Sequence, residues 1–155
     1  MIVVDTNVMV HLLAGLGPGE KAARLLANDP EWAAPTILLG ELRNVMVGLF
    51  RRGQIQASDA LAICVDAEAV LGERVVSVPS QPVLETAATG GMSAYEAEFV
   101  VLARSLGVPL VTADRVILEG APDVAVPLQH PHQPPPATPT LSRATSPAGG
   151  KYGSK

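Results

Sequence analysis

The chain has 155 residues, of which 48% are hydrophobic and 3% aromatic, so it can form a domain with its own core and is not disordered throughout. No apolar run is long enough to span a bilayer and the N-terminus lacks a signal peptide, which predicts a cytoplasmic protein without membrane association. Residues 1–128 carry 15 acidic and 8 basic residues, a net charge of −7, so they are not an obvious nucleic-acid binder unless metal cations offset that charge.

Short apolar segments alternate with helical patterns through residues 1–128, which indicates an α/β fold. Ser58 and Ser93 are expected to cap helices, and glycines 53, 72 and 107 to end them. In chain order we expect a strand over 2–5, helices over 7–14 and 20–27, a short strand over 32–34, a helix from 35 or 36 to 52, a helix from 58 to 71, a strand over 75–78, a short helix over 82–89, a helix from 93 to 106, a strand over 109–112 and an edge strand over 124–126.

The composition changes abruptly after Leu128. Residues 129–155 are rich in Pro, Ser, Thr and Gly and have almost no apolar periodicity. Such a segment cannot bury enough surface to offset its chain entropy, so we expect a domain over 1–128 followed by a disordered tail over 129–155. His130 and His132 lie among prolines and are interpreted as solvated residues rather than metal ligands.

Two acids follow apolar strands directly. Asp5 comes after Ile2-Val3-Val4, and Asp114 follows the strand predicted over 109–112. A carboxylate at the end of a buried strand costs free energy unless something compensates it, and in α/β sheets ligands bind at that edge. If the two strands are neighbours, Asp5 and Asp114 lie side by side. Asp114 could equally well cap a helix over 115–118.

Two glutamates in helices are further candidates. Glu41 projects from the apolar stripe of its helix, although it could also be a boundary residue that reaches water. Glu96 lies three residues after Ser93, the spacing of a capping box, so it could serve its own helix or point into a cleft. Glu98 lies about 200° around the helix from Glu96, so the two do not easily share one site.

A divalent cation would explain a convergence of acids. Carboxylates that meet without a basic partner repel one another and their pKa values rise, which a bound cation prevents. Oxygen ligands alone favour Mg²⁺ or Mn²⁺ over zinc, and no Cys/His spacing suggests otherwise. Such ions, with open positions for water and phosphate, support phosphodiester hydrolysis.

Three segments of the chain resemble PIN-domain nucleases, and within them the VapC-type toxins of toxin–antitoxin pairs. The similarity covers about residues 1–128. It rests on Ile2-Val3-Val4-Asp5-Thr6-Asn7, on Leu39-Gly40-Glu41-Leu42, and on Ser93-Ala94-Tyr95-Glu96-Ala97-Glu98-Phe99-Val100-Val101-Leu102-Ala103 with the later Leu106-Gly107-Val108-Pro109-Leu110-Val111-Thr112-Ala113-Asp114. The resemblance implies a three-layer α/β/α fold around a central, mostly parallel sheet of about five strands.

The resemblance also implies an activity, a cofactor and partners. The activity is a Mg²⁺-dependent endoribonuclease acting on single-stranded or structured RNA as a toxin, with Mn²⁺ as a substitute metal. The partners are a cognate antitoxin, an RNA substrate and a second copy of the chain. The implied acidic quartet is Asp5, Glu41, Glu96 and Asp114, with Asp5 and Glu96 as direct metal ligands and Thr6, Asn7 and Thr112 orienting water or carboxylates. Arg43, Arg51 and Arg52 are candidate RNA contacts, or else a solvated helix face.

One residue departs from the family pattern. The chain has Glu96 where the family usually has Asp, and Mg²⁺ tolerates distorted geometry poorly. The alternative is therefore a PIN-like protein that binds RNA or a partner but cleaves weakly or not at all. Other aspartate enzymes fit less well, because a haloacid dehalogenase-type phosphatase needs an Asp at position 7, which is Asn7, and a receiver domain needs a lysine near its site, whereas Lys21 lies on an early helix.

Overall fold

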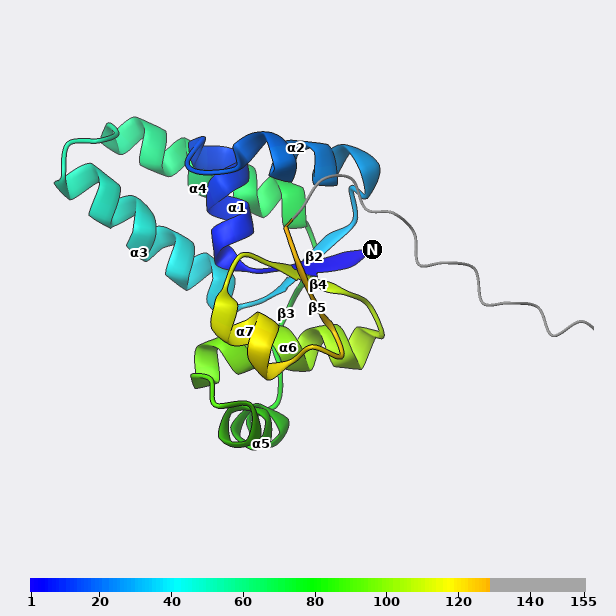
Figure 1. The fold of residues 1–155 in the computed structure, drawn as a ribbon. Helices are drawn as coiled ribbons and strands as arrows, with labels where there is room; N and C mark the ends of the chain where they lie inside the picture. Colours follow the sequence, from blue (N-terminus) through cyan, green and yellow to red (C-terminus); the bar gives the residue numbers. More distant parts are fainter. Residues whose placement is uncertain (129–155) are drawn as a thin grey trace, which may run out of the picture.

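Five short strands form one sheet in the order β3-β2-β1-β4-β5, and every pair of neighbours is parallel (Figure 1). The computed structural model describes residues 1–128, so the tail predicted at 129–155 lies outside the described residues. The strands are β1 (Ile2–Val4), β2 (Trp32–Pro35), β3 (Val75–Val76), β4 (Leu110–Thr112) and β5 (Ala125–Pro127). The predicted α/β fold with a central sheet of about five strands is confirmed.

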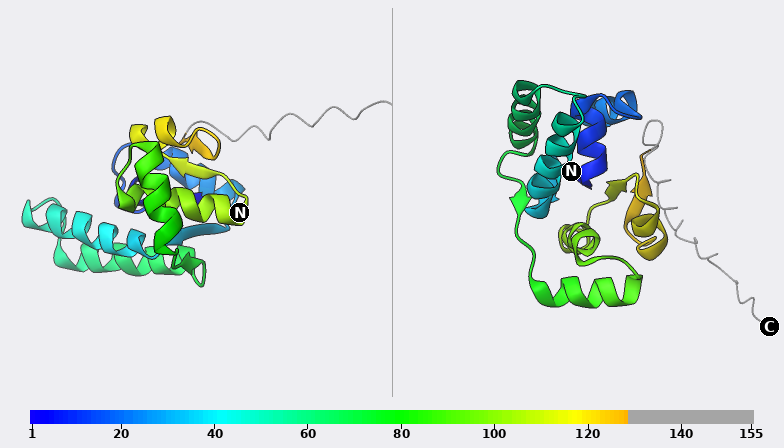
Figure 2. Two further views of the ribbon diagram at one scale, coloured as in Figure 1. Left: turned by 90° about the horizontal axis from the view of Figure 1, so that it is seen from below. Right: turned by 90° about the vertical axis from the view of Figure 1, so that its left-hand side faces the viewer.

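Seven helices of the described residues cover the two faces of the sheet. The helices are α1 (Thr6–Ala14), α2 (Gly19–Asn28), α3 (Ile37–Arg51), α4 (Ala57–Leu71), α5 (Ser80–Gly90), α6 (Ala94–Leu106) and α7 (Arg115–Gly120). Helices α1 to α4 lie on one side, and α6 lies on the other, with α5 outside it and α7 beside β5 (Figures 1 and 2). The molecule therefore has three layers, α/β/α. No helix within residues 1–128 has the length and apolar character needed to cross a membrane.

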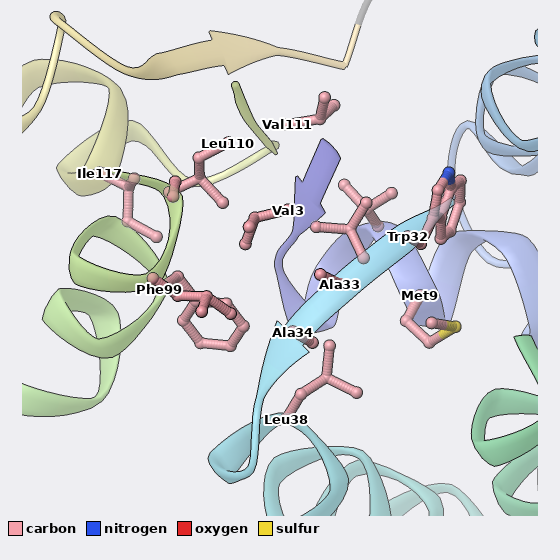
Figure 3. Close-up of a cluster of buried hydrophobic side chains, with 14 of the residues drawn as sticks. Val3, Met9, Trp32, Ala33, Ala34, Leu38, Phe99, Leu110, Val111 and Ile117 are labelled. Carbon is pink, nitrogen blue, oxygen red and sulfur yellow. The ribbon is translucent and has the colours of Figure 1, made fainter. Parts of the chain in front are cut away.

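The core lies on both faces of the central strands. Ile2, Val3 and Val4 are all buried, as expected for a strand in the middle of a parallel sheet. Figure 3 shows Val3 and Leu110 from neighbouring strands among the side chains that fill the interior. Phe99 of α6 reaches this interior with 2% of its surface exposed. The first strand is thus fixed in place by apolar contacts on both faces.

The pairing of β1 with β4 places the two strand-end acids at one edge. Val4 pairs with Val111, and the Asp5 N–H donates to the Val111 carbonyl at 3.3 Å. The two chains therefore leave the sheet together, β1 into α1 and β4 toward α7. The expectation that Asp5 and Asp114 follow neighbouring strands is confirmed.

Several predicted boundaries were wrong. Ser58 does not cap α4; the helix begins at Ala57, because the Asp59 carboxylate accepts a 3.0 Å hydrogen bond from the N–H of Gln56, two residues before Ser58. Strand β3 stops at Val76 rather than at residue 78, since its partner β2 ends at Pro35 and offers no further ladder position. Helix α5 begins at Ser80, which leaves Pro82 in the first turn, where a missing N–H costs nothing.

Candidate functional site

An open pocket of about 320 Å³ lies where β1 and β4 end, between the start of α6 and one face of α3. All four predicted acids line it, and they come from four separate parts of the fold. Asp5 and Thr6 begin α1, Glu41 lies on α3, Glu96 on the first turn of α6, and Asp114 after β4. The full lining is Asp5, Thr6, Asn7, Glu41, Asn44, Val45, Ser93, Tyr95, Glu96, Phe99, Asp114 and Ile117.

Asp5 is the most deeply placed of these acids, with 3% of its surface exposed. Its Oδ1 accepts a 2.8 Å hydrogen bond from the N–H of Val8, so the carboxylate also caps α1. Its Oδ2 accepts from the Thr112 hydroxyl and from the N–H of Ala113 at 3.3 Å. Burial raises the pKa of Asp5, and these hydrogen bonds only partly offset that increase. A cation beside Asp5 would favour its charged form.

The hydroxyl groups of Thr6 and Thr112 each donate a hydrogen bond to a carboxylate that lines the pocket. The Thr6 hydroxyl donates to Oε2 of Glu41, and this hydrogen bond links α1 to α3. Thr112 is fully buried, and its hydroxyl donates to Asp5 while accepting a 2.8 Å hydrogen bond from the N–H of Asp114. Both threonines therefore contact acids of the pocket. Thr112 itself is not among the residues that line the pocket.

Asp114 lines the pocket and also caps α7. Its Oδ1 accepts a 2.7 Å hydrogen bond from the N–H of Val116 and a 3.5 Å bond from that of Ile117. The two alternatives predicted for this residue are thus compatible, because a carboxylate has about four acceptor positions and these bonds use one oxygen.

Glu96 is turned toward its own helix. Its Oε2 accepts a 2.6 Å hydrogen bond from the N–H of Ser93, while the Ser93 hydroxyl accepts a 3.2 Å bond from the N–H of Glu96. This is the predicted capping box at the start of α6. Glu96 is nevertheless only half-buried and lines the pocket, so the capping role and the cleft position coexist.

Glu98 is an acid whose relation to the site was not predicted. It is half-buried outside the pocket lining, and burial, followed by repulsion from Glu41, raises its pKa. Its separation from Glu96 around α6 agrees with expectation. Its proximity to Glu41 could not be predicted, because that depends on how α3 packs beside α6.

Asn44 and Tyr95 also line the pocket without having been predicted. The position of Asn44 could have been predicted from helical spacing, since Asn44 is three residues after Glu41 and so lies on the same helix face. The three predicted arginines lie elsewhere. Arg43 donates to Glu68 of α4 at 3.2 Å, and Arg51 and Arg52 are exposed at the far end of α3. None of them is among the residues that line the pocket.

The donor chemistry of the pocket fits a hard divalent cation. Four carboxylates face one space of about 320 Å³, and one of them is buried with a raised pKa. As they stand, no three His, Cys, Asp or Glu side chains within residues 1–128 are grouped closely enough to bind a metal ion. Glu96 and Asp114 accept hydrogen bonds from the N-termini of their helices. The residue types suit a divalent metal ion, but the Glu96 side chain would have to turn away from the Ser93 N–H to bind one.

Comparison with known proteins adds a family match. The family model described as PIN domain matches residues 2–121 of the chain. No curated protein matches the sequence significantly.

Solved structures share the fold at low sequence identity. PAE2754 from Pyrobaculum aerophilum is 23% identical, with a TM-score of 0.67 over 82% of this chain and 90% of that one. A toxin–antitoxin complex from Klebsiella pneumoniae is 19% identical, with a TM-score of 0.61 over 83% and 98%. FitAcB from Neisseria gonorrhoeae is 20% identical, with a TM-score of 0.60 over 81% and 96%. At these identities the likeness concerns the fold alone.

Proposed function

The chain belongs to the PIN domain family, and from this premise we propose that it is a metal-dependent endoribonuclease that acts as the toxin of a toxin–antitoxin pair. The observation that carries the proposal is the convergence of Asp5, Glu41, Glu96 and Asp114 on one open pocket, with no Lys or Arg among the described residues that line it. Uncompensated acids in one place are costly in a purely structural role. They are the ligands that Mg²⁺ and Mn²⁺ prefer.

Asp5 and Glu96 would hold the metal directly, with Glu41 and Asp114 completing the acidic quartet. Bound there, Mg²⁺ would activate water and stabilise charge on the phosphate during hydrolysis of a phosphodiester bond. The protein's own contribution is positional. Thr112 and the Val8 N–H fix the Asp5 carboxylate, and Thr6 fixes that of Glu41, so their oxygens are held before substrate arrives. Asn7 is exposed at the pocket and can orient water there.

RNA that is single-stranded or structured is the proposed substrate. The domain has a net charge of −7, so metal ions must supply much of the attraction for phosphate at the site. Arg51 and Arg52, exposed at the end of α3, remain proposed contacts for more distant phosphates, and Arg43 would first have to leave Glu68.

An antitoxin and a second copy of the chain are the proposed protein partners. The structurally similar proteins include a toxin–antitoxin complex, which supports the first of these. Either partner would cover exposed apolar side chains, and helices α3 and α4 carry several, among them Val47, Phe50, Leu61 and Val65.

The test is cleavage of single-stranded RNA by the purified full chain with Mg²⁺ or Mn²⁺. We expect the wild-type protein to cleave and Asp5→Ala to be inactive, because the metal loses its most deeply buried carboxylate. Asp66→Ala is the matched control, since Asp66 is an exposed acid on α4 away from the pocket. Equal degradation by the wild type and Asp5→Ala would identify a contaminant and defeat the proposal.

A second candidate function rests on Glu96. Its carboxylate is held 2.6 Å from the Ser93 nitrogen and has one more methylene than the Asp usual in the family. This arrangement favours a protein that binds RNA or a partner and cleaves it weakly. RNA binding with Mg²⁺ but without turnover would support this candidate over the first.

A further inference from the structure

We propose that Tyr95 is a stacking platform for an unpaired nucleobase. The pocket would then bind RNA through stacking of a base on the Tyr95 ring as well as through the phosphate. This inference rests on the proposed function, because it names how that same site binds its substrate. It concerns a residue outside the acidic quartet and outside the three arginines.

Tyr95 is exposed at a place where exposure is otherwise unexplained. It is the second residue of α6, beside Glu96, and 59% of its surface is accessible although it lines the pocket. Of the other aromatic residues in the described part of the chain, Trp32 and Phe99 are almost fully buried, and Phe50 is 48% exposed but lies outside the pocket. A large ring left open to solvent loses the free energy that burial would contribute. A ligand with a flat face would recover it.

The surroundings of Tyr95 suit a base rather than a second phosphate. Phe99 lies four residues later, on the same face of α6, and with Val45 and Ile117 it gives the pocket an apolar part. Asn44, exposed on α3, adds an amide that can both donate to and accept from a base edge. Aromatic, apolar and amide groups together are typical of sites for unstacked bases.

The charge of the pocket favours a contact that does not depend on charge. The described residues that line it include four acids and no Lys or Arg, so the protein offers no cationic side chain there for the RNA backbone. A metal can bind one or two phosphate oxygens but does not position the nucleotide beside them. Stacking does not depend on charge, and every base has a face that can stack.

A consequence concerns the substrate. A base can lie on Tyr95 only when it is free of its helical neighbours, so the platform selects single strands, loops and ends over duplex RNA. It does not by itself select one base.

The experiment measures binding to the full chain with Ca²⁺ replacing Mg²⁺, so that bound RNA stays intact. The probes are end-labelled single strands of about ten nucleotides, with 2-aminopurine at one position in turn, because its fluorescence is quenched on stacking. Tyr95→Leu removes the ring and keeps apolar bulk, whereas Tyr95→Phe keeps the ring. Phe50→Ala is the matched control, since Phe50 is an aromatic residue 48% exposed that does not line the pocket.

We expect Tyr95→Leu to weaken binding by roughly 5- to 100-fold, the range found when an aromatic ring under a base is removed. Tyr95→Phe and Phe50→Ala should stay within about threefold of the wild type, and quenching at one position should persist in Tyr95→Phe and vanish in Tyr95→Leu. Circular dichroism verifies that each variant is folded.

If the wild type binds and Tyr95→Leu binds equally well with the same quenching, the stacking inference is overturned while the proposed nuclease stands. If the wild type binds no RNA, both fail.

Discussion

The Thr112 hydroxyl donates a hydrogen bond to Oδ2 of Asp5 across 107 positions of the chain, and it also accepts one from the N–H of Asp114. A single buried hydroxyl thus joins the two acids that follow β1 and β4. It stabilises the charged form of Asp5 against the opposing effect of burial on its pKa. If Asp5 binds the proposed metal, we expect Thr112 to affect both stability and metal affinity.

Thr112→Val tests this coupling, because it preserves the shape of the side chain and removes only the hydroxyl. We expect a loss of about 1–3 kcal/mol in the free energy of unfolding, since the Asp114 N–H and Asp5 both lose a buried partner. The pKa of Asp5 should rise further and Mg²⁺ affinity should fall. Urea unfolding and metal titration measure the two effects. Thr112→Ser should restore both, and a valine variant equal to the wild type would show that the hydroxyl contributes nothing.

Glu96→Asp separates the two roles of that residue. The shorter side chain reaches the Ser93 N–H less well, so we expect the unfolding free energy to fall by about 0.5–1 kcal/mol as the capping box weakens. Cleavage with Mg²⁺ should increase, because the carboxylate is freed from its helix and matches the family pattern. Melting temperature and initial rate measure these changes. Lower activity in the aspartate variant would indicate that the site is adapted to glutamate.

Metal binding should stabilise the folded chain, since an ion that binds only the folded state adds a free energy that grows with the logarithm of its concentration relative to its dissociation constant. At about 100 times its dissociation constant this gain is about 2.7 kcal/mol, which raises the melting temperature by several degrees. Asp5→Asn should abolish the shift with Mg²⁺. Without metal, the same variant should be less stable than the wild type, because both carboxylate oxygens of Asp5 accept hydrogen bonds and the Asn amide offers only one acceptor oxygen. Asp66→Asn, on exposed α4 surface, should keep the full shift.

The ion pair of Arg104 and Asp123 should make the free energy of unfolding depend on pH, independently of the acidic pocket. Arg104 donates to the two Asp123 oxygens at 2.9 and 2.8 Å, and this hydrogen bonding lowers the pKa of Asp123 below its ordinary value of 3.8. The folded state therefore holds the proton less tightly than the unfolded state. The resulting stability is present above pH 3.8 and is lost as the pH falls through the lower pKa of the folded state.

Asp123→Asn should accordingly be less stable than the wild type at neutral pH, by less than about 1 kcal/mol, because both side chains are largely exposed. The difference should fall as the pH drops below 3.8 and disappear below the lowered pKa of Asp123 in the folded state. Urea midpoints measured at several pH values test this. A difference that persists unchanged into strong acid would show that the pair is not its source.

The fold was largely predictable because its signals are local. An apolar run followed by an acid marks the ends of β1 and β4, and glycine with positive φ ends α6 at Gly107 as expected. The N-cap of α4 was mispredicted because Ser is a more common N-cap residue than Gln. In the structure Gln56 is the N-cap, and the Asp59 carboxylate accepts a hydrogen bond from its N–H.

The four acids named from the sequence line one pocket, and their roles stay predictions. Asp5, Glu41 and Asp114 interrupt or follow apolar patterns, whereas Glu96 was noted for its capping-box spacing and for the family resemblance. What could not be predicted depends on how helices pack. The proximity of Glu98 to Glu41 needs the placement of α3 relative to α6, and the direction of Arg43 toward Glu68 needs that of α4. Neither distance is encoded within one helix.

The strand order has a consequence for how the protein is made. β1 lies in the middle of the sheet, yet one of its two neighbours, β4, does not begin until residue 110. A nascent chain therefore carries an unpaired edge of its first strand until β4 has been made, and contacts this distant in sequence form slowly. Asp5 and Asp114 can meet only when almost the whole domain has left the ribosome. A chain that stops before residue 110 lacks β4 and Asp114, so its pocket has neither the second strand end nor one of its four acids.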